Sequence, residues 1–212
     1  MSECRLVLAR AAADAAARLG AHRAAHLALI QPMAASGALI LGIPLLGESG
    51  GYRGSLMLVA PEALDGYLAQ EPFLRHGLWD SHAVHRFRIA PLPYRPLPKG
   101  PAPAQPSHAV AIAFDGTDAA APSRRLAVRE AHLARVRPAA EEGLLTVGGA
   151  ILDAAGGMAG SVAVTAHASL AEARRWWSED PYLTGGVWQR VEWHASRFAP
   201  LPYRPLPGPL PG

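Results

Sequence analysis

The chain has 212 residues, of which half are hydrophobic, 17% are charged and 20 are prolines. This hydrophobic content is too high for a disordered chain, so we expect a folded protein with one large domain or two small ones. The single cysteine, Cys4, excludes an internal disulfide and a cysteine-rich metal site. A net charge of +3 is too small for a protein dedicated to nucleic acid, so no nucleic-acid partner is expected.

Thirteen of the 20 prolines lie in two clusters that contain the same nine residues. The segment Ala-Pro-Leu-Pro-Tyr-Arg-Pro-Leu-Pro occupies residues 90–98 and recurs at residues 199–207. Such an identity indicates a tandem duplication, in which the two segments pack at equivalent places. We therefore predict repeat 1 over residues 1–98, an extended proline-rich linker over 99–106, repeat 2 over 107–207 and a tail over 208–212.

The two halves also share residues with side chains capable of chemistry. An arginine and a histidine recur at the same spacing, and a carboxylate directly before a proline recurs further along the chain. The matched pairs are Arg23 and Arg129, His26 and His132, Glu71 and Asp180, and His85 and His194.

Within each repeat, the hydrophobic spacing predicts six elements in the order β-α-β-β-α-β. Glycines at positions 37 and 143 end the long helices, as glycines at helix C-termini do. This order is the ferredoxin-like split pattern, which belongs to the α+β class. In repeat 1 the predicted elements are 5–10, 15–35, 38–46, 54–60, 62–69 and 80–89. In repeat 2 they are 109–114, 123–142, 144–152, 160–166, 170–178 and 189–198.

One stretch without charges, between His26 and Glu48, is about as long as a membrane span. Two copies of one fold cannot have only one copy in lipid, so this stretch is predicted to be a helix followed by a buried strand. The N-terminus has no apolar signal segment and contains early acidic residues, so we expect a cytoplasmic protein without a membrane partner. The matching stretch of repeat 2 carries Arg135, Arg137, Glu141, Glu142 and Asp153.

His26 and His132 lie on the first predicted helix of their repeats, with Arg23 and Arg129 one turn earlier on the same face. A guanidinium beside an imidazole favours the neutral imidazole, which is the form that a general base requires. A carboxylate that orients the imidazole would complete a minimal acid–base pair. Structural hydrogen bonding is the alternative role for the histidines, and a turn that ends a helix is the alternative role for the carboxylates.

These residues resemble those of YciI-like proteins. The shared features are Arg-x-x-His-Leu on the first helix, a glycine before the second strand, and Asp-Pro-Tyr ahead of Gly-Val. The resemblance extends over nearly the whole chain, twice, and is clearer in repeat 2. The family belongs to the dimeric α+β barrel superfamily, whose members typically pack two ferredoxin-like sheets face to face. The resemblance therefore implies that the two β-α-β-β-α-β domains form such a barrel within one chain, related by a pseudo-twofold axis.

Elementary packing leads to the same expectation. A domain of about a hundred residues with one apolar sheet face exposed would be marginally stable, and the second repeat can cover that face. The tandem chain therefore stands in for a dimer. Association of this pseudo-dimer with further copies is left open.

The resemblance implies a His–Asp pair in a cleft between helix and sheet, formed by His132 and Asp180 in repeat 2. In repeat 1 it implies His26 with Glu71, where the family usually has aspartate, so this site is altered, repurposed or inactive. The implied activity is general acid/base chemistry without a metal or cofactor. The reaction would be an elimination, a dehydrochlorination or an isomerisation of a small, aromatic or lactone-like molecule. Either recurring arginine, Arg23 or Arg129, would hold an anionic group on that molecule.

Two other functions stay open at this point. The chain could be a ligand-binding or accessory protein without catalysis, or a cofactor-free monooxygenase of the same superfamily. Catalysis predicts a histidine close to a carboxylate in an open pocket. A binding module predicts that these side chains are turned into the packing and that a larger apolar patch is exposed.

Overall fold

The computed structural model describes residues 3–208 and shows both repeats folded in the predicted order. Two features were not predicted: a short 3-10 turn before the second helix of repeat 1, and a further four-residue helix after it. The elements of repeat 1 are β1 (Glu3–Ala11), α1 (Ala15–Ser36), β2 (Leu39–Leu46), β3 (Tyr52–Val59), η1 (Pro61–Ala63), α2 (Leu64–Gln70), α3 (Pro72–Arg75) and β4 (Trp79–Ile89).

Repeat 2 reproduces this order, including the additional short helix. Its elements are β5 (His108–Asp115), α4 (Ala121–Glu142), β6 (Leu145–Leu152), β7 (Met158–Thr165), α5 (Leu170–Trp177), α6 (Pro181–Thr184) and β8 (Trp188–Ser196). The long helices end at Gly37 and Gly143, whose φ angles of +85° and +88° are in the left-handed region that favours glycine. Each glycine therefore stops its helix and turns the chain into the next strand.

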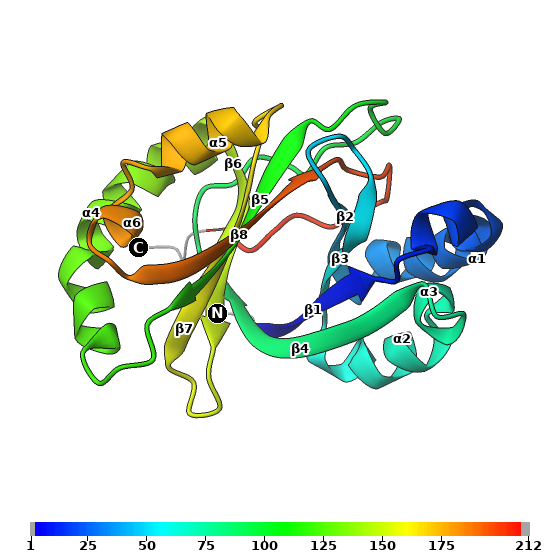
Figure 1. Cartoon of the computed structure of the whole chain (residues 1–212), viewed down its shortest axis with the longest axis horizontal. Helices are drawn as coiled ribbons and strands as arrows, with labels where there is room; N and C mark the ends of the chain where they lie inside the picture. Colours follow the sequence, from blue (N-terminus) through cyan, green and yellow to red (C-terminus); the bar gives the residue numbers. More distant parts are fainter. Residues whose placement is uncertain (1–2, 209–212) are drawn as a thin grey trace.

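The eight strands form one closed antiparallel barrel in the order β1-β3-β2-β8-β5-β7-β6-β4. Each repeat contributes four neighbouring strands, and the repeats meet at two seams. At one seam, β4 and β6 pair from Arg86–Leu152 to Ile89–Gly149, whereas at the other, β2 and β8 share only the pair Leu46–Ala195. The long helices lie on the two outer flanks, α1 on the right and α4 on the left of Figure 1. The predicted α+β barrel within one chain is thereby confirmed.

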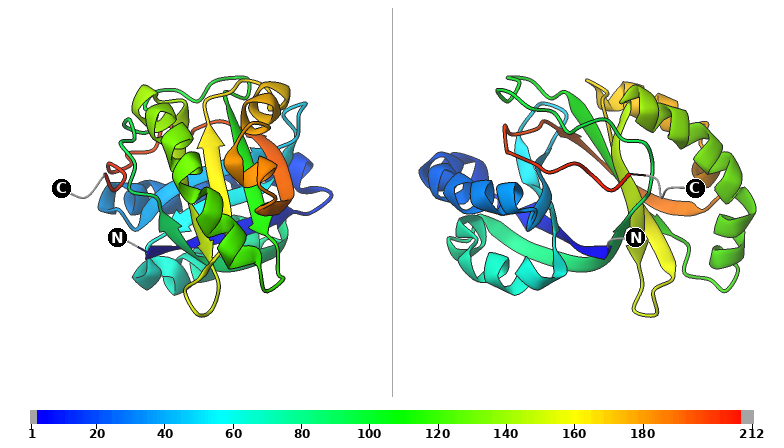
Figure 2. Two further views of the ribbon diagram at one scale, coloured as in Figure 1. Left: turned by 90° about the vertical axis from the view of Figure 1, so that its left-hand side faces the viewer. Right: turned by 180° about the vertical axis from the view of Figure 1, so that it is seen from behind.

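The largest hydrophobic cluster extends from the inside of the barrel to the helices of repeat 1 and includes strand residues from both repeats. Leu6 and Leu58 of repeat 1 share this core with Val110 and Val164 of repeat 2. Each repeat therefore covers the inner sheet face of the other. The outer faces are covered by helices, and Figure 2 shows α4 lying across the strands of repeat 2.

The two identical proline segments pack in exchanged positions. The first segment, residues 90–98, follows the last strand of repeat 1 but lies against repeat 2, and Leu92 belongs to the hydrophobic core of that repeat. The second segment, residues 199–207, follows the last strand of repeat 2. Its Leu201 belongs to the hydrophobic cluster that includes the helix and strand residues of repeat 1. In the right-hand view of Figure 2 this second segment, in red, runs toward the side of repeat 1.

Each proline segment is fixed by its tyrosine and arginine. Tyr94 donates a hydrogen bond from its hydroxyl group to the carbonyl oxygen of Gly148 at 2.9 Å and accepts one from the N–H of the same glycine at 3.1 Å. The following residue, Arg95, donates to the carbonyl oxygen of Glu141 at 2.8 Å. The second segment makes the equivalent contacts with repeat 1, which explains why one nine-residue sequence serves two places.

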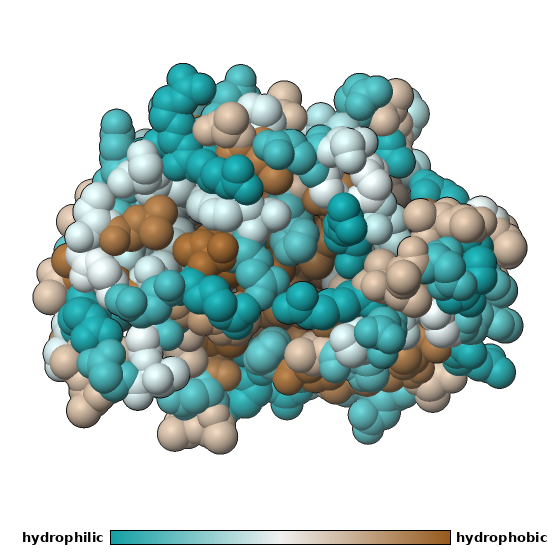
Figure 3. Space-filling model, viewed as in Figure 1, coloured by the Kyte–Doolittle hydropathy of each residue, from teal (hydrophilic) through white to brown (hydrophobic). Residues whose placement is uncertain are grey.

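The uncharged stretch between His26 and Glu48 folds as the end of α1 followed by β2, as predicted. Among the helices of residues 3–208, none combines the length and the apolar character that crossing a membrane requires. Figure 3 shows hydrophilic side chains across the middle of one face, between the two repeats, with hydrophobic ones visible among them.

Candidate active site

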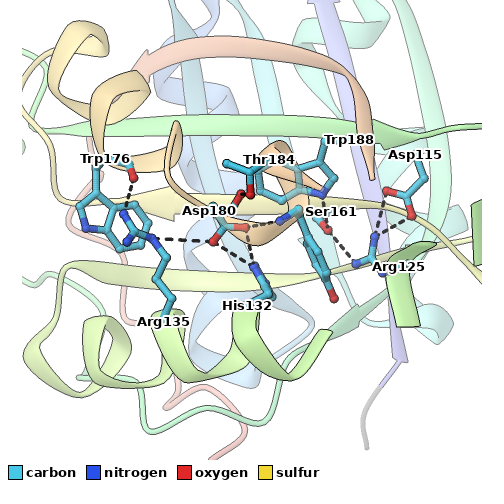
Figure 4. Close-up of polar contacts among 10 residues, drawn as sticks. Asp115, Arg125, His132, Arg135, Ser161, Trp176, Asp180, Thr184 and Trp188 are labelled. Carbon is cyan, nitrogen blue, oxygen red and sulfur yellow. Dashed lines mark hydrogen bonds and ion pairs between the residues drawn. The ribbon is translucent and has the colours of Figure 1, made fainter. Parts of the chain in front are cut away.

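In repeat 2 the recurring histidine and carboxylate are in direct contact. The Nδ1 atom of His132, on α4, lies 2.9 Å from Oδ1 and 3.1 Å from Oδ2 of Asp180 (Figure 4). Because a carboxylate only accepts hydrogen bonds, this contact places the hydrogen of a neutral imidazole on Nδ1. The other ring nitrogen, Nε2, is then the basic atom, and it has no hydrogen-bond partner within the described range 3–208.

Asp180 is held in place by the turn that it forms. It precedes Pro181 as the N-cap of α6, and its Oδ1 atom accepts a hydrogen bond from the backbone N–H of Tyr182 at 2.9 Å. The carboxylate is fully buried. Asp180 therefore both caps the short helix α6 and contacts the histidine.

His132 lies at the wall of an open cavity of about 520 Å³ between α4 and the sheet. Its ring stacks on that of Tyr182, with the ring centroids 3.8 Å apart, and about one-eighth of its side chain is exposed. Trp177 and Trp188 also line the cavity. The imidazole is thus fixed on one side by Asp180 and on one face by an aromatic ring.

A buried ion pair that the sequence analysis did not identify forms another part of the same cavity. Arg125 donates to both carboxylate oxygens of Asp115, at 2.9 and 2.7 Å, and to Ser161 Oγ at 2.9 Å. Its guanidinium also lies 4.5 Å from the centre of the Tyr182 ring. Burial raises the pKa of Asp115, and the nearby Arg125 opposes this effect. The signal in the sequence was the absence of a match, since Leu19 stands at the equivalent position of repeat 1.

A second arginine, Arg135, lies on the far side of Asp180. Its Nε atom is 4.0 Å from Asp180 Oδ2, and its guanidinium covers the ring of Trp176 at 4.5 Å and donates to the backbone oxygen of that tryptophan. Repeat 1 has Leu29 at the equivalent position. Only the repeat 2 carboxylate therefore has a guanidinium beside it.

The predicted anion-binding arginine, Arg129, lines the cavity of repeat 2, but its side chain also reaches solvent and contacts Glu130 at 3.1 Å. The cavity is completed by repeat 1, because Arg88 at the end of β4 and the first proline segment line it as well. Its charged lining residues are Arg88, Arg125, Arg129, Glu130 and Arg137.

Repeat 1 contains the same histidine–carboxylate contact. His26 Nδ1 lies 2.8 Å from Oε1 of Glu71, which also accepts from the backbone N–H of Phe73 at 3.0 Å. The His26 ring stacks on Phe73 with the ring centroids 4.2 Å apart, as His132 does on a tyrosine. The additional methylene of glutamate is accommodated without loss of the contact.

The surroundings of the repeat 1 pair differ from those of repeat 2. The cavity beside His26 is smaller, about 310 Å³, and Arg23 lies on its wall among mainly apolar residues. Within the described part of the chain, the buried Oε2 atom of Glu71 and the buried hydroxyl group of Tyr67 have no hydrogen-bond partner. Burial and the nearby Glu71 raise the pKa of Tyr67.

The remaining recurring histidines, His85 and His194, lie in neither cavity. Both are on last strands, β4 and β8, with their side chains toward the inside of the barrel. For metals, residues 3–208 contain no group of three or more His, Cys, Asp or Glu side chains placed to hold an ion.

Comparison with known proteins places these features in a family. The sequence profile of the YCII-related domain matches residues 108–194, a range that contains His132 and Asp180. Protein YciI of Escherichia coli O6:H1 is 38% identical over 74 residues, and the match covers 32% of this chain and 76% of that protein. An uncharacterised protein of Haemophilus influenzae is 42% identical over 74 residues, with the same two coverages.

Solved structures show a similar fold over both repeats. A chlorite dismutase variant from Candidatus Nitrospira defluvii matches 93% of this chain and 91% of its own with a TM-score of 0.52 and 13% sequence identity. At this identity the similarity concerns the fold alone. The sequence matches show that the chain belongs to the YCII-related, YciI-like family, and the structure shows the α+β fold of repeat 2 present in repeat 1 as well.

Proposed function

We propose that the chain is a small enzyme of the YciI type and that repeat 2 is its catalytic half. In this proposal His132 is the general base and Asp180 orients it. The observation that carries the proposal is that His132 Nδ1 contacts a fully buried carboxylate while Nε2 is left free beside a cavity of about 520 Å³.

The proposed chemistry is a proton transfer. His132 Nε2 takes a proton from a carbon atom of the substrate, and Asp180 stabilises the imidazolium that forms. In an elimination, the electron pair of the broken C–H bond forms a double bond as the leaving group departs with its own pair. For a dehydrochlorination the leaving group is chloride, and the imidazolium then returns its proton to water. In an isomerisation, the same nitrogen returns the proton to another atom of the substrate.

The cavity supports a small, aromatic or lactone-like substrate with an anionic group. Tyr182, Trp177 and Trp188 contribute ring atoms to the cavity wall, against which a flat apolar molecule can pack. Arg129 is placed on the same helix one turn before His132 and is assigned the anionic group. Arg125 is less suited to this role because its charge is already paired with the buried carboxylate of Asp115.

Repeat 1 supports a second function, ligand binding without turnover. Its histidine–glutamate contact is intact, but leucines at positions 19 and 29 replace the two arginines that flank the repeat 2 pair. The smaller cavity beside His26 suits an apolar molecule. In this proposal His26 and Glu71 orient a ligand, with Arg23 at the edge of the cavity.

The exposed surface gives less support to a pure binding module. Among residues 3–208, the large hydrophobic side chains that are exposed are Val84 and Leu126. They lie on different elements, a strand of repeat 1 and a helix of repeat 2, so no large apolar patch of the kind expected for a docking protein is formed.

The test uses the whole chain with a chlorinated hydroxyquinol, an aromatic compound suited to the dehydrochlorination that the family resemblance implies. Chloride release is followed with the native chain and with His132→Ala, Asp180→Asn and His26→Ala. We expect the first two substitutions to lower the rate of release by about 10²-fold or more and His26→Ala to retain it. Undiminished turnover in His132→Ala would contradict the assignment. Oxygen uptake measured in parallel separates elimination from a cofactor-free monooxygenase reaction, which consumes oxygen.

A further inference from the structure

The two recurring histidines outside the candidate site, His85 and His194, face the inside of the barrel. His85 is paired directly with Leu6 across β1 and β4, and His194 with Val110 across β5 and β8. Directly opposed residues of antiparallel strands share a face of the sheet. Because Leu6 and Val110 belong to the barrel core, both histidines point into the lumen.

At this end of the barrel the lumen is a cavity of about 740 Å³, lined by strands of both repeats. The opposite end is filled by large side chains such as Phe87 and Ile89. At the open end, the corresponding inward positions of β4 hold the small residues Ser81 and Ala83. The cavity also borders the seam between β2 and β8, where the strand ladder has the single pair Leu46–Ala195.

The polar side chains of this cavity are arranged by depth. Arg10 and Arg190 lie at the rim, with 71% and 58% of their side chains exposed, whereas Glu192 and His194 lie deeper, at 26% and 20%. Burial lowers the pKa of His194 and that of His85. Both imidazoles are therefore predominantly uncharged at neutral pH and can donate or accept hydrogen bonds.

Glu192 connects the rim to the deeper part. Arg10 of repeat 1 lies 3.4 Å from it, Arg190 donates to it, and His194 Nε2 is 4.0 Å away. The Arg190 guanidinium also covers the Phe114 ring at 4.1 Å. The formal charges of the whole lining are three arginines against two carboxylates, which leaves one positive charge without a counterpart: Arg10, Arg53 and Arg190 against Asp80 and Glu192.

This composition is not that of a closed core. The surroundings of the histidines have diverged between the repeats, since Arg10 corresponds to Phe114 and Ala83 to Glu192, yet the imidazole is present in both. Apolar surface from Leu8 and Ile112 lies in the same cavity. The lining therefore offers cationic groups at the rim, hydrogen-bonding imidazoles and an apolar floor.

We infer that this barrel mouth is a second ligand site, separate from the His132 cavity, that binds a small monoanionic carboxylic acid with an apolar body. The carboxylate of the ligand accepts hydrogen bonds from Arg10 and Arg190, and both arginines keep their contacts with Glu192. The apolar body of the ligand lies over Leu8 and Ile112. The imidazoles of His85 and His194 line the same cavity. A single negative charge matches the single excess positive charge of the lining.

The test is a titration of the full chain with benzoate, followed by NMR of the histidine ring signals. The ring signals of His85 and His194 are assigned with single His→Gln substitutions. We expect these two signals to shift in a saturable manner, because the benzoate ring would lie beside them. The signals of His26 and His132 report on the other two cavities in the same sample.

Two variants test the site by different means. Arg190→Gln removes a rim cation and is expected to weaken benzoate binding about tenfold, the effect of losing a charge-assisted hydrogen bond. Ala83→Phe fills the cavity without changing its charge and is expected to abolish the shifts. Arg174→Gln, an exposed arginine on α5 outside the cavity, is the matched control and should bind benzoate like the native chain.

Three results would overturn the inference. One is the absence of saturable shifts at His85 and His194, and another is a response confined to His26 or His132. The third is unchanged binding in Ala83→Phe, because a ligand in the barrel mouth cannot share that space with a phenylalanine ring. None of these results bears on chloride release by the His132 site, so the two proposals fail independently.

Discussion

The hydroxyl group of Tyr203 binds both backbone polar groups of Gly42, donating to its carbonyl oxygen at 2.7 Å and accepting from its N–H at 3.2 Å. The two residues are 161 positions apart and belong to different repeats. Gly42 lies in the middle of β2, on the strand that lines the His26 cavity. The tyrosine of the second proline segment therefore fixes a strand of the other repeat from outside the sheet.

We predict that Tyr203→Phe destabilises the chain by about 1–3 kcal/mol, because it leaves buried backbone groups of Gly42 without their partner. Tyr94→Phe is the equivalent variant of the first proline segment. It removes the same two contacts from Gly148 and should destabilise the chain similarly. The free energy of unfolding in urea measures both effects. An unfolding midpoint unchanged in both variants would show that the proline segments contribute little to stability.

The order and the extent of most elements could be predicted from the sequence, for reasons visible in particular residues. Glycine at position 37 marks the end of α1 and the apolar run after it marks β2, within one or two residues of the structure. The four-residue helices α3 and α6 were not predicted, because a single turn has no hydrophobic period. Their signal was a carboxylate followed by proline, which is a helix start as well as a turn.

The exchange of the proline segments and the Arg125–Asp115 pair could not be predicted. Both depend on contacts between residues that are far apart in the sequence, and nothing local to Tyr94 indicates that it binds the opposite repeat. The candidate site was easier to identify, because the other half of the chain has a histidine matching His132 and a carboxylate, Glu71, matching Asp180. Their catalytic roles stay predictions that the chloride-release assay tests.

The buried Asp115–Arg125 ion pair of repeat 2 can be tested by replacing it with the uncharged residues found at the same positions of repeat 1. Removing only Asp115 leaves the Arg125 guanidinium buried without a counter-charge, so Asp115→Ala should destabilise the chain by about 3–5 kcal/mol. The double variant Asp115→Ala/Arg125→Leu copies the residues that repeat 1 has, Ala11 and Leu19. We expect it to recover most of the lost stability.

Chemical unfolding of Asp115→Ala, Arg125→Leu and the double variant forms a double-mutant cycle, which isolates the interaction between the two side chains. If the double variant were as unstable as Asp115→Ala alone, the loss would come from a cavity in the packing and not from an unpaired charge.

Stability should fall on acidification because of His108, which is buried at the start of β5. Burial lowers its pKa to about 4 from 6.5, so the folded state binds its proton less readily than the unfolded state does. The contribution of the neutral imidazole is fully present above pH 6.5 and is lost as the pH falls toward 4. The expected loss at pH 4 is about 2–3 kcal/mol.

The check is the free energy of unfolding at pH 7, 5.5 and 4 for the native chain and for His108→Gln, which cannot titrate. The difference between the two chains should shrink or change sign as the pH is lowered. A difference that is constant over this range would mean that His108 is not protonated on unfolding.

The two histidine–carboxylate pairs allow the length of the carboxylate arm to be tested within one chain. Asp180→Glu gives repeat 2 the residue that repeat 1 has, and the Glu71 contact of 2.8 Å shows that the longer arm can reach an imidazole. We therefore expect Asp180→Glu to retain part of the chloride release, and Asp180→Asn to lose about 10²–10⁴-fold, because an amide cannot stabilise the imidazolium. The reciprocal Glu71→Asp is the control and should leave the rate unchanged if repeat 2 is the catalytic half. Equal losses in Asp180→Glu and Asp180→Asn would instead show that the position of the carboxylate, and not only its charge, limits the reaction.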